Sequence, residues 1–356
     1  MTPVYAAHGS AEFNARLHET LRRLAADVNA AMGNDLVALV LGGGYGRGEG
    51  AVVRRGGLEC AYNDLDLFLV ARRKGVATGA LDAVRVRYAA ELGIEFDISR
   101  PLTPAAVAAW PPALMWFDLL HGHVVLSGPD DVFTIRAPAA LRRPLPPIEA
   151  THLLLNRGAG LLWAMRTARG VEPPPGDDFV RRNYWKCAQA LGDALLIAYG
   201  RYATPYAGRD GRLAGLAAER AEVGALGLAA LYADALKFKF SPDDLPAGPV
   251  PDAHLAELAR RWAAVFLLIE QRRTGRAWPG LAAYCAWTGL REPRASAPLQ
   301  WPRTIGQNMR LGVFSWRYPR ERLYRALPAL LAPAGAASSA WAEESAGFLA
   351  VWRRFN

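Results

Sequence analysis

Two aspartates spaced two residues apart, Asp64 and Asp66, are the residues of this chain whose type and spacing best suit chemistry. They lie in an apolar segment, DLDLFLV. Alternate side chains of a strand share a face, so both carboxylates would project from one side of a sheet. Such carboxylates repel each other unless a cation lies between them, and Mg2+ prefers one or two carboxylates plus substrate phosphates. The pair predicts a metal site, although aspartates also alternate on solvated strand faces.

A glycine-rich segment, LGGGYGRGEG over residues 41–50, directly follows the apolar run 36–41. Glycines allow backbone N–H groups to approach phosphate oxygens, because no side chain stands between them. A third feature follows at residues 94–98, IEFDI, which predicts another short strand with Glu95 and Asp97 on one face. The three features together indicate a site for a metal ion and a nucleotide.

In this order, the segments resemble the nucleotidyltransferase superfamily typified by DNA polymerase beta, and within it the minimal nucleotidyltransferases. That signature runs Gly-Ser-x-Ala-Arg-Gly-[Asp/Glu]-[Ala/Gly], then an Asp-x-Asp strand, then a later strand with one Asp. Residues 43–50, the paired acids and Asp97 match it in turn. Gly44 departs from it, because the family has serine there. The gap before Asp64 is also longer and predicts a protruding loop over 54–63.

The resemblance implies roles for the acids. Asp64 and Asp66 would bridge two Mg2+ ions, or Mn2+, and these ions would clamp the entering and leaving oxygens. Asp97 would bind the catalytic ion and help to deprotonate the acceptor hydroxyl. It is preferred to Glu95 as the third acid because apolar residues flank it on both sides, as in the family.

The resemblance also implies nucleotide contacts. Gly43 and Gly44 would offer backbone N–H groups to the beta and gamma phosphates, with Tyr45 beside them. Arg47 would either neutralise charge on the pyrophosphate or pair with Glu49.

Residues 137–147, APAALRRPLPP, are rich in proline and predict a domain boundary. Before it, strands over 36–41, 64–70, 94–99 and 123–126 alternate with helical segments. These include a helix over 11–32, with Ser10 as its cap and Gly33 as its stop, and a short helical turn over 45–53. After it, apolar residues recur three and four apart almost to the end, which predicts helices over 148–168, 179–200, 213–240, 252–274, 279–288, 320–331 and 338–355. We therefore expect an α+β protein, with a small mixed-sheet nucleotidyltransferase domain over 1–140 and an all-α helical bundle over 148–356.

The helical domain is expected to complete the site. Lysine is scarce in this chain, which favours a specific use for Lys186. It could reach a phosphate of the nucleotide, and Tyr184 nearby could stack on the base. A solvated lysine beside a core aromatic residue explains the same pattern equally well. Residues 291–325 interleave arginines with aromatic residues; packing over the bundle is favoured, then an anionic acceptor, then RNA.

Composition adds little about partners. The formal net charge is +9, but nearly all of the 42 basic residues are arginine, which indicates coding bias in a GC-rich bacterium. No signal peptide or long apolar run is apparent, and the three cysteines fit no zinc spacing. We expect a cytoplasmic protein with no membrane partner.

The sequence thus predicts an enzyme that moves an NMP from an NTP, ATP or CTP in first place, to a hydroxyl of an acceptor. A small-molecule acceptor is favoured, and nucleic acid is not. Two alternatives remain open. One is a protein- or tRNA-modifying enzyme of a toxin-antitoxin pair, and the other is a regulator that binds nucleotide without turnover.

Overall fold

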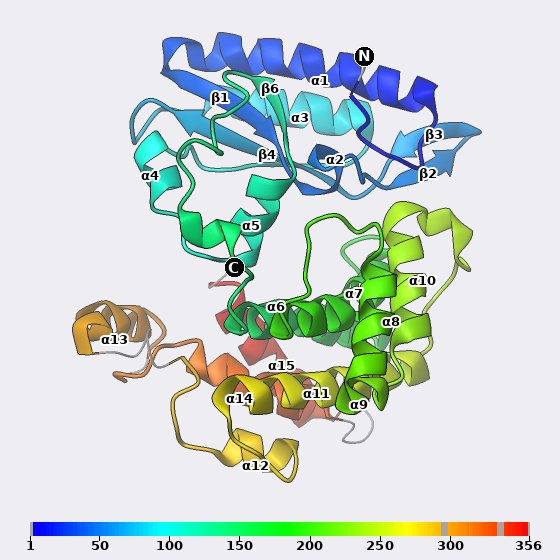
Figure 1. The fold of residues 1–356 in the computed structure, drawn as a ribbon, viewed down its shortest axis with the longest axis vertical. Coiled ribbons are helices and arrows are strands. Elements are labelled where there is room, and N and C mark those ends of the chain that lie inside the picture. Colours follow the sequence, from blue (N-terminus) through cyan, green and yellow to red (C-terminus); the bar gives the residue numbers. More distant parts are fainter. Residues whose placement is uncertain (1–2, 293–297, 313, 333–337, 355–356) are drawn as a thin grey trace. The chain divides into compact units, whose positions relative to one another are not determined.

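The computed structural model describes residues 3–292, 298–312, 314–332 and 338–354 of the chain (Figure 1). The fold is α+β, as expected, and it divides into two compact units. The first comprises residues 1–146, 200–212 and 236–247, and the second comprises residues 147–199, 213–235 and 248–356. The first unit therefore holds the sheet and all of the predicted acids.

A small mixed sheet forms the centre of the first unit, with strand order β5-β4-β1-β6. Strand β4 runs antiparallel to β1 and parallel to β5, and β6 runs antiparallel to β1. The parallel pair follows from the connection between β4 and β5, which is long enough to contain a crossover helix. The strands are β1 Leu36–Leu41, β4 Asp64–Ala71, β5 Glu95–Ile98 and β6 Val124–Ser127.

Helices cover both faces of this sheet (Figure 1). On one face, α1 Ala11–Met32 and α3 Ala80–Leu92 pack their apolar sides onto Leu65, Leu67 and the inward residues of β1. On the other face, a second core gathers α4 Pro104–Ala108 and α5 Leu114–His121 around Val40 and Val70. As predicted, Ser10 caps α1 and Gly33 ends it.

Residues 54–63 do not form the protruding loop predicted for them. Instead β2 Val52–Arg55 pairs antiparallel with β3 Leu58–Ala61 in a hairpin. The turn is Gly56-Gly57, and both residues have positive φ, which is the conformation that a tight two-residue hairpin turn requires. The predicted helical turn over 45–53 is likewise shorter, because helix α2 spans only Gly43–Gly46 and β2 begins at Val52.

Two later segments belong to the first unit, so a single boundary at 137–147 does not describe the chain. Residues 200–212 return to the glycine-rich turn, where the backbone N–H of Tyr206 donates to the Glu49 carboxylate at 2.7 Å. Residues 236–247 return to the hairpin, where Asp243 accepts from the backbone N–H of Arg54 at 2.7 Å. Within the predicted linker itself, Leu141 is fully buried in the second core of the sheet.

The second unit is helical, as expected. Trp262 of α11 lies against Gly158 of α6, where a Cβ would come within 2.8 Å of its ring, and its indole N–H donates to the Leu154 carbonyl at 2.9 Å. The helices that lie wholly in this unit are α6 Ile148–Ala168, α7 Phe179–Ala198, α9 Ala221–Gly224, α11 Asp252–Thr274, α12 Leu281–Ala286, α13 Trp301–Arg310, α14 Glu321–Leu331 and α15 Ser339–Trp352.

The helical prediction differs from the structure in three places. The single helix expected over 213–240 is broken into α8 Arg209–Glu219, α9 and α10 Ala229–Phe240, with Gly227 at positive φ between the last two. Helix α13 was not predicted. The last helix was expected to reach Phe355, which lies outside the described residues, and it ends at Trp352.

Buried charges tie the helices of the second unit together. The fully buried Glu270 of α11 accepts hydrogen bonds from Thr151 of α6 at 2.7 Å and Tyr284 of α12 at 2.8 Å, and it pairs with Arg273 at 2.6 Å. Nearby, Arg291 is also fully buried, and its side chain lies 3.7 Å from Glu321. These two buried carboxylates serve packing, because each accepts hydrogen bonds and lies beside an arginine.

Candidate functional site

The pairing of β4 with β5 brings the predicted acids together. In the parallel register Asp66 is opposite Asp97, and Asp64 is opposite Glu95. Because alternate residues share a face, all four carboxylates occupy the same face at the same end of the sheet. The residues between them, Leu65 and Phe96, are buried in the core beneath α1 and α3. The sheet thus presents an acidic face whose opposite side is fixed by packing.

The glycine-rich turn lies directly against this face. Gly42, at the end of β1, donates its N–H to the carbonyl oxygen of Asp66 at 2.8 Å. Gly43 follows with a φ of 61°, and a Cβ at this position would lie 2.0 Å from Oδ2 of Asp66. Only glycine meets both conditions without strain. The carboxylate of Asp66 and the backbone of the turn are therefore neighbours, as a shared metal and phosphate site requires.

Asp64, Asp66 and Asp97 are suited in type and position to hold a hard cation, since they offer carboxylate oxygens from adjacent strand positions. In the described residues, however, no three His, Cys, Asp or Glu side chains are already gathered in a metal-binding arrangement. One carboxylate oxygen of Asp64 instead accepts a hydrogen bond from the amide of Asn63. The acids fit a metal by chemistry and strand register, and rotation of their side chains would have to complete the ligand set.

The side chain of Tyr45 points into the fold, and a contact between this residue and nucleotide remains a prediction. Tyr45 is buried, with 3% of its surface exposed, and its hydroxyl donates to the carbonyl oxygen of Ala51 at 2.5 Å while accepting from the N–H of Tyr62 at 2.8 Å. Burial raises the pKa of this phenol. The ring therefore joins the glycine-rich turn to the segment before β4, and it stabilises the turn from within.

Arg47 is directed into the fold rather than toward solvent. Its Nε lies 3.4 Å from the carboxylate of Glu49, with both side chains 10% exposed, and its guanidinium lies 5.3 Å from the centre of the Tyr206 ring. This is the pairing with Glu49 that the sequence left open. These contacts attach residues 200–212 to the glycine-rich turn. A contact between Arg47 and pyrophosphate remains a prediction.

Lys239 is the residue of this site that the sequence did not reveal. Its Nζ donates to the carbonyl oxygen of Glu49 at 3.2 Å. A Cβ on Gly44 would lie 2.8 Å from the same nitrogen, so the ammonium occupies space beside the turn that a larger residue would need. In the sequence, the scarcity of lysine was the signal that could have identified Lys239. It applies to Lys237 and Lys239 as much as to Lys186.

Tyr184 and Lys186 lie on α7 in the second unit. Tyr184 is half-buried, its ring makes an edge contact with Trp185, and burial raises the pKa of its hydroxyl. Both residues belong to a different unit from the three acids, and their contact with nucleotide remains a prediction.

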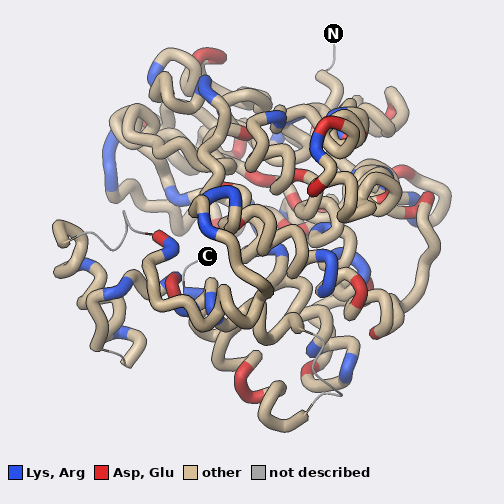
Figure 2. The backbone as a smooth tube through the Cα atoms, turned by 60° about the horizontal axis from the view of Figure 1, so that its bottom comes forward, with Lys and Arg blue, Asp and Glu red and all other residues tan. Residues whose placement is uncertain are grey.

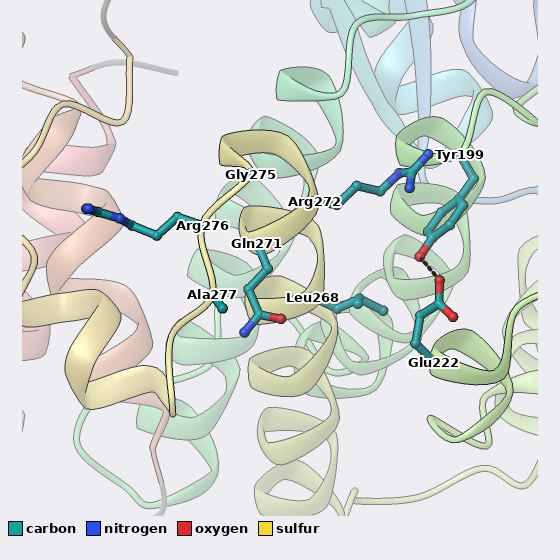
Figure 3. Close-up of a pocket in the computed structure, with 8 residues that line it drawn as sticks. All are labelled: Tyr199, Glu222, Leu268, Gln271, Arg272, Gly275, Arg276 and Ala277. Atoms are coloured by element: carbon teal, nitrogen blue, oxygen red, sulfur yellow. Dashed lines mark hydrogen bonds between the residues drawn. The ribbon is translucent and has the colours of Figure 1, made fainter.

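A separate surface pocket of about 420 Å3 lies in the second unit, near the end of α11 (Figure 3). Within it, the Tyr199 hydroxyl donates to Glu222 at 2.9 Å and Arg272 lies over the Tyr199 ring at 4.1 Å. These pairs join the ends of neighbouring helices, and the pocket contains no predicted site residue. Its lining is Tyr199, Glu222, Leu268, Gln271, Arg272, Gly275, Arg276 and Ala277.

No protein-family model, curated protein or solved structure matches this chain. Arguments about its function therefore rest on the residues and geometry of the site.

Proposed function

We propose that the first unit is a polymerase-beta-like nucleotidyltransferase that moves an NMP from an NTP to a hydroxyl of a small-molecule acceptor. The observation that carries this proposal is the position of Asp66. It faces Asp97 across the parallel pair and at the same time touches the glycine turn at Gly43. A carboxylate face and a phosphate-binding backbone at one point are what nucleotidyl transfer requires.

Lys239 supports the same proposal. The family has serine at the position of Gly44, where its hydroxyl would face the phosphates. Here the glycine leaves space that the Lys239 ammonium occupies. An ammonium is a mobile cation with three donors, so it can replace a hydroxyl as a phosphate contact and also neutralise charge.

Mg2+ held by Asp64, Asp66 and Asp97 would supply the charge that stabilises the entering and leaving oxygens. Groups of the protein itself would bind the phosphates and accept the proton. Backbone N–H groups of the glycine turn would bind phosphate oxygens, and Lys239 would hold the leaving pyrophosphate. Asp97 is exposed on β5, where it could accept the proton of the acceptor hydroxyl.

The test is a screen of the full chain with each NTP and Mg2+. Thermal shift would report binding, and pyrophosphate release would report turnover with aminoglycosides, tRNA or protein extract as acceptors. We expect stabilisation by ATP or CTP only with metal, and turnover with a small acceptor. Asp97→Asn should lose turnover, whereas Glu95→Gln, on the same strand face, should retain it.

Two results would redirect the proposal. Binding of nucleotide without turnover on any acceptor would favour a regulator, the reading to which the missing serine at position 44 lends some support. Turnover confined to tRNA or protein would favour a modifying enzyme of the toxin-antitoxin kind. Lack of any metal-dependent NTP binding would refute the nucleotide site itself.

A further inference from the structure

Exposed apolar side chains are concentrated in one short part of the second unit. Of the ten large apolar residues that are exposed in the described chain, five lie between positions 299 and 316. The most exposed are Leu299, at 93%, and Phe314, at 85%. We call this group the α13 surface, and its members are Leu299, Trp301, Met309, Phe314 and Trp316. Gathered in this way, they differ from the isolated exposed residues of ordinary surfaces.

Helix α13 leaves apolar side chains exposed beside a buried polar pair. It buries Thr304 and Asn308, which are four residues apart and so share a face. Its apolar Trp301 and Met309 are 40% and 64% exposed. In water an amphipathic helix normally buries its apolar side. Here Trp301 and Met309 keep much of their apolar surface in water, and contact with another apolar phase would cover it.

The α13 surface is held in place by hydrogen bonds rather than left as a loose tail. Asn308 is fully buried, and its amide donates to the carbonyl oxygens of Ser315 at 2.9 Å and Arg317 at 2.8 Å. The rings of Trp301 and Trp316 meet with their centroids 6.0 Å apart. In Figure 1, α13 stands out from α6 and α11. The apolar residues are thus presented outward by the fold.

The same segment is basic. Between Glu292 and Glu321 the sequence has no acidic residue and five arginines. Elsewhere along the backbone, acidic and basic residues are interspersed (Figure 2). Arg303 and Arg310 are exposed on α13 itself, and the guanidinium of Arg317 lies 5.4 Å from the Trp316 ring. The remaining arginines are Arg320 and Arg294, and Arg294 lies outside the described residues.

We propose that the α13 surface binds the surface of a membrane rich in anionic lipids. Interfacial helices combine Trp, Phe and Leu on one side with arginine on the other, and this surface has both. Trp prefers the boundary between headgroups and acyl chains, while arginine reaches the phosphates. No helix in the described part of the chain is long and apolar enough to cross a membrane, so the contact would be peripheral.

The α13 surface suits lipid better than RNA. Single-stranded nucleic acid stacks its bases on open aromatic faces. Here Trp301 and Trp316 contact each other at 53°, and two of the five residues, Leu299 and Met309, are aliphatic. The proposal differs from the sequence-based expectation, which favoured packing and no membrane partner. Packing holds for Arg291 and Tyr324, both fully buried, but not for the residues of the α13 surface.

The test is sedimentation of the full chain with vesicles of phosphatidylglycerol and phosphatidylcholine, compared with pure phosphatidylcholine, at low salt. We expect binding to the anionic vesicles alone. Each surface arginine contributes about 1 kcal/mol near an anionic membrane, so Arg303→Gln/Arg310→Gln should weaken binding about 30-fold. Leu299→Ser/Phe314→Ser should weaken it at least about tenfold through lost apolar burial. Ile135→Ser, at a residue 67% exposed in the first unit, is the matched control and should bind as wild type does.

Three results would overturn the proposal. One is failure to sediment with anionic vesicles, and another is equal sedimentation with neutral ones. The third is wild-type vesicle binding by both double variants with unchanged thermal unfolding. A fluorescent single-stranded RNA tests the rejected partner, and RNA binding that both double variants abolish, without vesicle binding, would assign the surface to nucleic acid. None of these readouts depends on nucleotide transfer.

Discussion

In the first unit, three aspartates share one end of a sheet face with one another, whereas in the second unit the buried carboxylates of Glu270 and Glu321 lie beside arginines. Asp66 and Asp97 are opposite each other on adjacent strands. Glu270 instead is enclosed by Arg273, Thr151 and Tyr284. Like charges gathered together cost folding energy, whereas a buried pair, once formed, is costly to break. The comparison separates acids that we propose bind a ligand from acids that stabilise the fold.

The largest effect is expected for Asp66→Asn, which should lower turnover about a thousandfold or more, because metal-ion catalysis is worth several kcal/mol of transition-state stabilisation. Thermal stability should be unchanged or slightly higher, since one of two like charges is removed. The measurements are pyrophosphate release and a melting curve. Asp82→Asn, at an exposed position on α3, is the control and should change neither. Wild-type turnover by Asp66→Asn would show that the site is assigned wrongly.

Glu270→Gln should lower stability and leave nucleotide binding intact, which is the reverse of the pattern expected for Asp66→Asn. Removing one partner of a buried pair leaves Arg273 uncompensated, which should cost about 3–5 kcal/mol of stability. Metal-dependent NTP affinity should persist in the folded fraction. On the same helix, Glu257 pairs with Arg260 and is 44% exposed, so Glu257→Gln should cost less than about 1 kcal/mol. Equal losses of unfolding free energy in the two variants, measured by chemical denaturation, would remove the distinction between buried and exposed acids.

Lys239→Met should weaken NTP affinity by about 1–3 kcal/mol, the scale of a lost hydrogen bond to a charged group. Lys237, exposed two residues earlier on α10, supplies a closely matched control, and Lys237→Met should bind NTP as wild type does. Titration by fluorescence or calorimetry at constant Mg2+ measures both. Lys186→Met tests the sequence-based choice in parallel. A loss in Lys186→Met but not in Lys239→Met would favour the original choice.

The smallest effect concerns His152, whose ring nitrogens lie 3.0 Å from Glu149 and 3.0 Å from Glu292, with Arg320 beside them. Burial opposes its charge, but the hydrogen bonds to both carboxylates outweigh burial and raise the pKa of His152 above 6.5. A raised folded-state pKa gives stability that is present below 6.5 and lost as pH rises through the folded value.

The unfolding free energy of wild type should therefore fall as pH rises from 6.5, and His152→Gln should remove this dependence. His254→Gln, at an exposed position on α11, should keep it. A wild-type profile that is flat above pH 6.5 would contradict the charged state of His152.

Local patterns determined a large part of the first unit. Alternation placed Asp64 and Asp66 on one face of a strand, and the helical period with Ser10 and Gly33 fixed the bounds of α1. These features follow from neighbouring residues, so no knowledge of the fold was needed. The hairpin over 52–61 was missed, although its Gly56-Gly57 turn is itself a local signal.

What the sequence by itself determined is the type of site: paired acids after a glycine turn, with a third acid on a later strand. Only the tertiary structure decided which lysine lies beside that turn, since Lys239 is 190 residues from Glu49 in the sequence. It also directed the Arg47 side chain toward Glu49 and left Trp301 and Met309 of α13 exposed. Contacts between distant segments depend on how whole elements pack, and neither the residue type nor its near neighbours encode that packing.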